Sequence, residues 1–187
     1  YILSDEPYRE LAYDGADVPY IPCFYRNTIV GYSWSKSMSL PGERIGYLVI
    51  PSGLDDHDLI WDAACTSNRI LGFVNAPSLM QLAVARCLNE KTDIDAYDRN
   101  RQALYNGLTG LGFDCVYPRG AFYLWMKTPC DEKAFVDAAK RHCLLLVPGS
   151  SFAMPGYVRL AYCVSPERIA RSMPAFAQLA EEFGLRK

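Results

Sequence analysis

A lysine set among serines is the first candidate for chemistry. Lys36 directly follows a β-rich run over residues 28–32, and four serines lie within three residues of it: Ser33, Ser35, Ser37 and Ser39. A partly desolvated lysine is an amine nucleophile, because burial lowers its pKa. Serine hydroxyls beside it suit a phosphate group. Taken alone, the same residues also fit an ordinary exposed loop with a solvated lysine.

Two arginines add sites for anions. Arg44 follows Lys36 by eight residues, at the start of the next β-rich run, and its guanidinium suits a phosphate. A surface ion pair is the alternative for Arg44. Arg159 lies inside the apolar run 157–162 and needs a partner there, because an unpaired buried charge is costly. That partner is either a structural carboxylate of this chain or the carboxylate of a ligand.

A carboxylate and a phenol form the third group. Asp5 and Tyr8 lie three positions apart in Asp5-Glu6-Pro7-Tyr8, just after a short apolar run. They could contribute an acid and a hydroxyl to a site. The structural alternative is a helix start, with Asp5 as the N-cap and Pro7 in the first turn.

The elements that must position these residues alternate between strands and helices. Strands are expected over residues 28–32, 45–50, 121–127, 143–147 and 157–163. Helices are expected over 55–69, 77–89, 95–111 and 131–142, and from Pro166 onward with Ser165 as N-cap. The segment 33–44 is expected to be a polar loop, and the helix 77–89, apolar nearly all round, is expected to be buried. This order predicts an α/β fold.

Composition excludes several classes of protein. The 187 residues carry a formal net charge of −2, which gives no electrostatic case for nucleic acid or an anionic membrane as partner. No apolar run reaches the roughly 18 residues of a membrane span. Seven cysteines without a C-x-x-C pair, and only two histidines, indicate neither a zinc site nor a disulfide scaffold. We expect no metal site, and we expect most of the cysteines to be reduced, small core residues of a cytoplasmic protein.

Taken together, the three groups resemble the class I/II aminotransferases of fold type I, the pyridoxal-phosphate-dependent aspartate aminotransferase superfamily. The chain resembles their C-terminal half, from Tyr1 to its end. The supporting motifs are Asp5-Glu6-Pro7-Tyr8, Ser33-Trp34-Ser35-Lys36, Gly42-Glu43-Arg44-Ile45-Gly46-Tyr47, Gly120-Ala121-Phe122-Tyr123, Val147-Pro148-Gly149-Ser150-Ser151-Phe152 and Pro155-Gly156-Tyr157-Val158-Arg159-Leu160.

The resemblance implies three catalytic residues that also bind the cofactor, pyridoxal 5′-phosphate. Lys36 would form the Schiff base with the cofactor aldehyde and later move the substrate proton. Asp5 would pair with the pyridine nitrogen and keep it protonated, which makes the ring a better electron sink. Tyr8 would hydrogen-bond the phenolic oxygen of the cofactor.

The resemblance also implies the anion sites. Ser33 and Arg44 would hold the cofactor phosphate, with Ser35 as a further candidate. Arg159 would bind the substrate α-carboxylate through a bidentate fork. Trp34 and Tyr32 are expected to be packing residues.

The resemblance further implies a domain division and partners. Residues 1–75 would be the C-terminal portion of a large, mostly parallel PLP-binding domain. Residues 76–94 would be a connecting helical region, and residues 95–187 a small α/β C-terminal domain. Substrates would be an α-amino acid and a 2-oxo acid, and the enzyme would be a homodimer because such sites lie at a subunit interface. Which amino acid is used stays open.

Because the chain opens abruptly at Tyr1, it is expected to be a fragment of a longer protein. In the family, the N-terminal half carries a phosphate loop, the aromatic residue that stacks on the cofactor ring and an asparagine near its phenolic oxygen. A tyrosine of the second subunit usually reaches the phosphate. The fragment alone is therefore expected to be inactive.

Two alternatives use the same residues. A carbon–sulfur lyase of this fold would keep the lysine, the aspartate and the arginine, and would release pyruvate and ammonia. The effector domain of a transcription regulator would also keep them, joined to a basic helix-turn-helix segment upstream.

Overall fold

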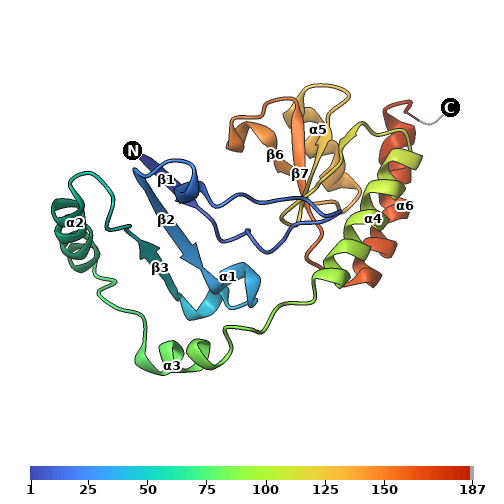
Figure 1. The fold of residues 1–187 in the computed structure, drawn as a ribbon. Coiled ribbons are helices and arrows are strands. Elements are labelled where there is room, and N and C mark those ends of the chain that lie inside the picture. Colours follow the sequence, from blue (N-terminus) through green and yellow to red (C-terminus); the bar gives the residue numbers. More distant parts are fainter. Residues whose placement is uncertain (186–187) are drawn as a thin grey trace. The chain divides into compact units, whose positions relative to one another are not determined.

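The computed structural model describes residues 1–185 and divides into two compact units. The first unit spans Tyr1–Thr92 and the second begins at Asp93. Figure 1 shows both units, coloured along the sequence. Each unit has its own β-sheet. The fold is mixed α/β, as the alternation of the sequence predicts.

The sheet of the first unit has the order β1-β2-β3. β1 (Ile2–Asp5) runs parallel to β2 (Thr28–Ser33), which runs antiparallel to β3 (Gly46–Val49). Thr28 and Val30 of β2 are buried on one face of the pleat, as the period of two along a strand dictates. The long connection from β1 to β2 contains a 3-10 turn (Ile21–Cys23) and also packs inward through Leu11 and Tyr13.

Short helical elements replace the polar loop expected over residues 33–44. The helical turn α1 (Trp34–Ser37) follows β2 directly, and a 3-10 turn (Pro41–Glu43) precedes β3. The expectation of a loop was wrong because local polarity does not report main-chain hydrogen bonding. The Met38 amide, for example, donates to the Trp34 carbonyl oxygen at 3.3 Å.

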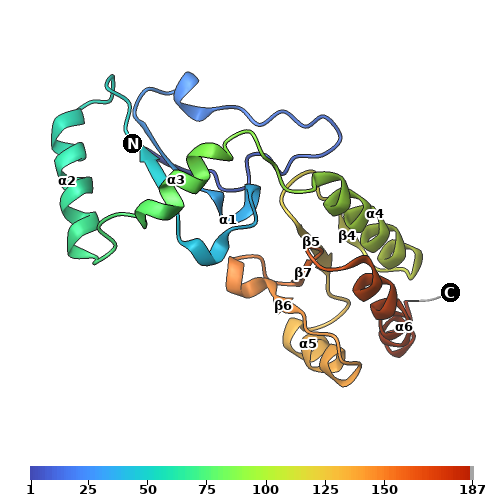
Figure 2. The same cartoon turned by 90° about the horizontal axis from the view of Figure 1, so that it is seen from below.

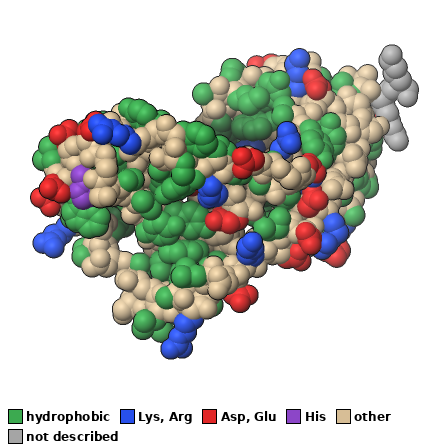
Figure 3. All heavy atoms as spheres, viewed as in Figure 1, with side chains coloured by type: hydrophobic (Ala, Val, Ile, Leu, Met, Phe, Trp, Pro, Cys, Tyr) green, Lys and Arg blue, Asp and Glu red, His purple; other side chains and the backbone are tan. Residues whose placement is uncertain are grey.

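Two further helices complete the first unit, α2 (His57–Ile70) and α3 (Ser78–Arg86). α3 is not buried as expected: the side chains of Leu79 and Leu82 are 73% and 67% exposed, and Val84 is its only buried residue. An apolar pattern shows that a helix has surface to bury, but not what covers it. Figure 3 shows hydrophobic side chains gathered on the visible face of this unit.

The second unit has a four-stranded antiparallel sheet in the order β4-β5-β7-β6. Its helices α4 and α6 lie side by side in both ribbon views (Figures 1 and 2). The element bounds are β4 (Cys115–Val116), β5 (Tyr123–Lys127), β6 (Val147–Pro148), β7 (Tyr157–Ala161), α4 (Ile94–Gly110), α5 (Glu132–Arg141) and α6 (Pro166–Glu182).

Alternation along β5 and β7 separates a buried face from a face that carries functional groups. Leu124 and Met126 of β5, like Val158 of β7, are fully buried in the core with the helices. Trp125 and Arg159 lie opposite each other on the other face, where they are only half-buried. The core therefore fixes which way Arg159 points.

The strand expected over 143–147 is reduced to Val147–Pro148. The preceding residues end α5 instead: Cys143 adopts a left-handed conformation (φ 59°), and the Leu144 amide donates to the Ala139 carbonyl oxygen at 2.9 Å. This is the hydrogen-bond pattern of a helix C-terminus closed by a left-handed residue. Ser165 caps α6 as expected, accepting from the Arg168 amide. α6 continues through Pro174.

None of the seven cysteines, all within the described residues, forms a disulfide, but they are not core residues as expected. Six are exposed and Cys115 is half-buried. Cys163 shows the physical reason, because the chain alternates there: Leu160 and Tyr162 are buried, whereas Ala161 and Cys163 face outward. Apolar neighbours in sequence therefore do not place a thiol inside.

Two negative findings apply to the described residues. No helix in residues 1–185 has both the length and the apolar character to cross a membrane. Within the same residues, no cluster of three or more His, Cys, Asp or Glu side chains could hold a metal ion.

A fully buried arginine ties α4 to the segment before β5. Arg101 is 0% exposed; its Nε donates to Asp98 Oδ1 at 2.7 Å and its Nη1 to the Pro118 carbonyl oxygen at 2.7 Å. Its guanidinium also lies 4.9 Å from the centre of the Tyr117 ring. Sequence analysis singled out neither Arg101 nor its partners.

We predict that Arg101→Ala lowers the free energy of unfolding by about 3 kcal/mol, because it breaks a buried ion pair and leaves a carbonyl oxygen unpaired. Arg99→Ala is the matched control: Arg99 is on the same helix, exposed, and 3.9 Å from Asp93. Its loss should change stability by less than about 0.5 kcal/mol. Urea unfolding of both variants measures the difference, and equal effects would contradict the prediction.

Candidate functional site

The parallel pairing of β1 and β2 brings two of the predicted groups to one edge of the sheet. Asp5 is the last residue of β1 and pairs in register with Gly31, and the Glu6 amide donates to the Gly31 carbonyl oxygen at 2.8 Å. The carboxyl ends of parallel strands are where α/β sheets usually bind ligands. Asp5 is exposed there.

Asp5 does not start a helix, so the structural alternative for this motif is wrong. Residues 7–10 form a turn rather than a helix. In that turn the Leu11 amide donates to the Tyr8 carbonyl oxygen at 2.9 Å. Tyr8 lies in this turn and is half-buried.

Lys36 lies beside Tyr8. The lysine is the third residue of α1, which begins directly after β2, and its Nζ is 5.6 Å from the centre of the Tyr8 ring. Both side chains are half-buried. An ammonium at this distance from an aromatic ring is attracted by the negative face of the ring. Residues 28 positions apart in sequence thus place an amine next to a phenol.

The predicted phosphate ligands occupy the same stretch of chain. Ser33 and Ser35 have their hydroxyl oxygens 2.8 Å apart, with Ser33 in extended backbone before α1. Arg44 is exposed and left-handed (φ 49°), and its Nη1 donates to the Pro41 carbonyl oxygen at 2.7 Å. Within residues 1–185 it forms no ion pair, so the surface ion pair considered for it is wrong.

Gly46 permits the close approach of the segment after Arg44 to β2. A Cβ atom at this position would lie 2.4 Å from the Tyr32 carbonyl oxygen and 3.1 Å from the Cβ of Ser33. Only glycine fits there without moving the backbone that presents Ser33.

A hydrogen-bonded network holds α1 against β2. The Tyr32 hydroxyl donates to Glu10 Oε1 at 2.9 Å and lies 2.8 Å from the Ser37 hydroxyl oxygen. Burial, with the nearby Glu10 carboxylate, raises the pKa of Tyr32 to about 12, so the hydroxyl keeps its proton. Tyr32 also packs against Trp34 and Tyr47, with ring centres 5.7 Å and 5.2 Å away.

Sequence analysis missed this network. It expected Tyr32 and Trp34 only as packing residues, which their ring contacts confirm, and did not consider Glu10. Glu10 and Tyr32 are 22 positions apart, so no local spacing could have paired them. Ser37 is buried at the end of α1, next to Lys36 in sequence, so the network constrains the helical turn that carries the lysine.

In the second unit, Arg159 lies between two aromatic rings. Its guanidinium carbon is 4.1 Å from the centre of the Tyr123 ring and 3.9 Å from that of Phe152. Among residues 1–185 no carboxylate pairs with Arg159, so the structural-carboxylate alternative is wrong. Stacking fixes the plane of the guanidinium and leaves its N–H fork available to a planar anion.

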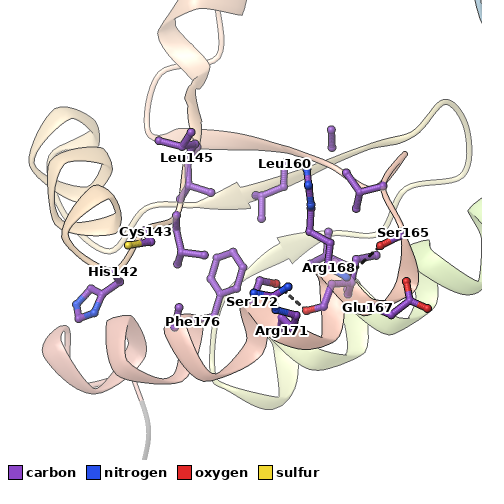
Figure 4. Close-up of a pocket in the computed structure, with 17 residues that line it drawn as sticks. His142, Cys143, Leu145, Leu160, Ser165, Glu167, Arg168, Arg171, Ser172 and Phe176 are labelled. Atoms are coloured by element: carbon purple, nitrogen blue, oxygen red, sulfur yellow. Dashed lines mark hydrogen bonds between the residues drawn. The ribbon is translucent and has the colours of Figure 1, made fainter.

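Two cavities differ in how they relate to the predicted site residues. In the first unit, a cavity of about 570 Å³ includes Asp5 and Ser33 but is otherwise lined mainly by β3 and α2; neither Lys36 nor Tyr8 lines it. In the second unit, a cavity of about 710 Å³ lies between α6 and the segment after α5 (Figure 4). None of the predicted site residues is among the described residues that line this second cavity.

We predict that Tyr32→Phe lowers the free energy of unfolding by about 1.5 kcal/mol, because the Glu10 carboxylate loses the hydrogen bond that the Tyr32 hydroxyl donates. Tyr47→Phe is the control: Tyr47 is in the same aromatic cluster, but its hydroxyl makes no hydrogen bond within residues 1–185. Thermal unfolding compares the two variants. An unchanged stability of Tyr32→Phe would show that the network does not hold α1.

Comparison with known proteins assigns the family. The model for aminotransferase class I and II matches residues 1–176. The aspartate/prephenate aminotransferase of Thermus thermophilus is 31% identical, over 96% of this chain and 48% of the relative. The aromatic-amino-acid aminotransferase 2 of Thermococcus litoralis is 27% identical, over 97% of this chain and 49% of the relative.

A solved structure agrees with these relatives. The crystal structure of an aminotransferase from Eubacterium rectale matches with a TM-score of 0.94 and 46% identity, covering 97% of this chain and 46% of that one. The chain thus spans about half the length of the curated relatives it matches. With a family model that extends over nearly all its residues, the chain belongs to the class I and II aminotransferases.

Proposed function

We propose that this chain serves a pyridoxal-phosphate-dependent enzyme that transfers an amino group between an α-amino acid and a 2-oxo acid. The observation that carries the proposal is the Lys36 amine beside the Tyr8 ring, at the edge of the sheet where Asp5 ends β1. The names of the relatives, aspartate/prephenate and aromatic-amino-acid aminotransferases, support the same reaction class.

The chemistry of these side chains fits the cofactor. An amine can attack the carbonyl carbon of the cofactor, and a carboxylate can pair with its protonated ring nitrogen. A phenol can donate a hydrogen bond to the oxygen on its ring. Lys36 would be the amine, Asp5 the carboxylate and Tyr8 the phenol. Exposed Arg44, without a carboxylate partner in the described residues, would hold the phosphate with the paired hydroxyls of Ser33 and Ser35.

In the proposed reaction, Lys36 acts twice. Its amine would bind the cofactor and, once free, would move the proton from the substrate Cα to the cofactor's carbonyl carbon. When bound, the cofactor supplies an electron sink for the charge that this proton transfer leaves on Cα. The Tyr32–Glu10–Ser37 network would hold the turn that carries Lys36.

Arg159 would bind the substrate α-carboxylate. A planar guanidinium held between two rings presents two parallel N–H groups, which match a carboxylate bidentately. Fixing the carboxylate limits the orientations of the Cα–H bond, and orientation contributes strongly to rate. The proposal covers α-amino acids as a class.

We also propose the division that the resemblance implies. Residues 1–75 would be the C-terminal portion of the large PLP-binding domain, residues 76–94 the connecting region and residues 95–187 the small domain. The enzyme would act as a homodimer.

The anchor of the cofactor is testable by chemical trapping. Expressed as the whole reading frame, incubated with pyridoxal phosphate and reduced with borohydride, the protein should carry one reduced pyridoxyl group. Peptide mass mapping should locate it on Lys36, because Lys36 is the lysine beside Tyr8. Lys36→Ala should abolish the adduct, whereas Lys91→Ala should keep it. A folded protein without an adduct on Lys36 would overturn the assignment.

The 187-residue chain by itself should bind pyridoxal phosphate weakly and show no useful turnover, because the family's remaining cofactor contacts come from other parts of the enzyme. The measurement compares visible absorbance and keto-acid formation between this chain and the whole reading frame. Robust turnover by the chain alone would contradict the prediction. Pyruvate and ammonia from the whole protein, without amino transfer, would indicate a carbon–sulfur lyase instead.

A further inference from the structure

A glutamate that the proposed function does not use holds the loop next to Arg159. Glu132 is the first residue of α5, and its carboxylate accepts four hydrogen bonds from the segment before β7. The Ser150 amide lies 3.2 Å from each oxygen, the Ser150 hydroxyl 2.5 Å from Oε1, and the Gly156 amide 3.1 Å from Oε2. These hydrogen bonds hold the pKa of Glu132 below its ordinary value, and the one from the Ser150 hydroxyl contributes most. Glu132 is therefore ionised near neutral pH.

The loop that Glu132 holds is tightly closed. It begins with a 3-10 turn (Gly149–Phe152) and continues through Ala153, which is left-handed (φ 56°). The Met154 amide donates to the Gly149 carbonyl oxygen at 3.0 Å, and a Cβ atom on Gly149 would lie 2.1 Å from the Met154 carbonyl oxygen. Glu132 joins the two ends of this loop, at Ser150 and Gly156, through one carboxylate.

The same loop supplies one of the two rings that stack on Arg159. Phe152 is the last residue of the 3-10 turn, and its ring centre is 3.9 Å from the guanidinium carbon. Phe152 is 45% exposed, and its ring packs edge-on against Trp125 with the ring centres 5.9 Å apart. The position of Phe152 therefore depends on the loop, and the loop depends on Glu132.

We infer that Glu132 is a positioning residue: through the Ser150–Gly156 loop and Phe152 it orients the guanidinium of Arg159 for a substrate carboxylate. The inference rests on the proposed function, since it takes Arg159 as the carboxylate ligand. Glu132 does not touch Arg159; its charge is taken up by the loop donors. The tighter the loop, the fewer orientations Arg159 can adopt before substrate arrives.

The first test is a split between KM and kcat in the full-length enzyme loaded with cofactor. Glu132→Gln should raise KM for the amino acid about tenfold, the loss expected when charge-assisted hydrogen bonds become neutral ones, and leave kcat within about twofold. Ser150→Ala, which removes only the hydroxyl donor, should raise KM less. Glu167→Gln is the matched control, a first-turn glutamate on another helix of the same unit.

Reference variants separate this inference from the proposed function. If Arg159→Ala leaves KM unchanged, Arg159 is not the carboxylate ligand and the positioning role of Glu132 fails with it, whereas the amino transfer proposed for Lys36 is tested separately by the borohydride adduct. If Arg159→Ala raises KM but neither Glu132→Gln nor Ser150→Ala does, only the positioning role fails. In the Arg159→Ala background, Glu132→Gln should add nothing to KM, because both act through one contact.

A second readout does not depend on turnover. Hydrogen exchange of peptides covering residues 149–156 should be faster in Glu132→Gln than in the parent protein, and unchanged in Glu167→Gln, because Glu132 accepts from the Ser150 and Gly156 amides. Calorimetry with two unreactive acids, propionate and 3-phenylpropionate, should show that Glu132→Gln binds each acid about tenfold more weakly than the parent protein does. Slower turnover at unchanged KM and unchanged acid affinity would indicate a merely structural role and overturn the inference.

Discussion

The parallel pairing of β1 with β2 is the constraint on which the candidate site depends. Register places Asp5 opposite Gly31, so both strands end at one edge, and the chain leaving each strand contributes one partner of the Lys36–Tyr8 pair. Burial of Thr28 and Val30 on one face of β2 specifies this register, because a slip of one residue would turn every side chain of the strand to the other face. The glycine at position 46 lets β3 close on β2 just behind the serines.

In the second unit, the alternation of side chains along antiparallel strands positions Arg159. Its antiparallel sheet buries Leu124, Met126 and Val158 against helices, and the same alternation leaves Arg159 on the opposite face with Tyr123 beside it. A charged side chain is tolerated in this apolar strand because aromatic faces solvate it partly and its N–H edges stay accessible. The contrast with Arg101 is instructive: that arginine is wholly buried, its donors are used by Asp98 and Pro118, and it is structural.

Hydrogen-bond networks near the Lys36–Tyr8 pair and near Arg159 connect residues that are distant in sequence. Glu10 receives the Tyr32 hydroxyl, and Glu132 receives donors from Ser150 and Gly156. Each carboxylate restrains a short turn, α1 in the first case and the loop before β7 in the second. Short turns have few hydrogen bonds of their own, so an external carboxylate contributes much of their order.

By itself, the sequence determined the α/β class, most element positions and the family, because periodicity, caps and compact motifs are local. Ser165 as a cap and the motif around Lys36 are of this kind. Only the tertiary structure decided that Asp5 caps no helix, that α3 and six of the seven cysteines lie exposed, and that Arg159 has aromatic rather than carboxylate neighbours among residues 1–185. The tertiary structure also revealed the hydrogen bonds that Glu10 and Glu132 accept from distant residues. These outcomes depend on which distant segments meet, and local sequence carries no record of that because packing and hydrogen-bond partners are chosen across the fold.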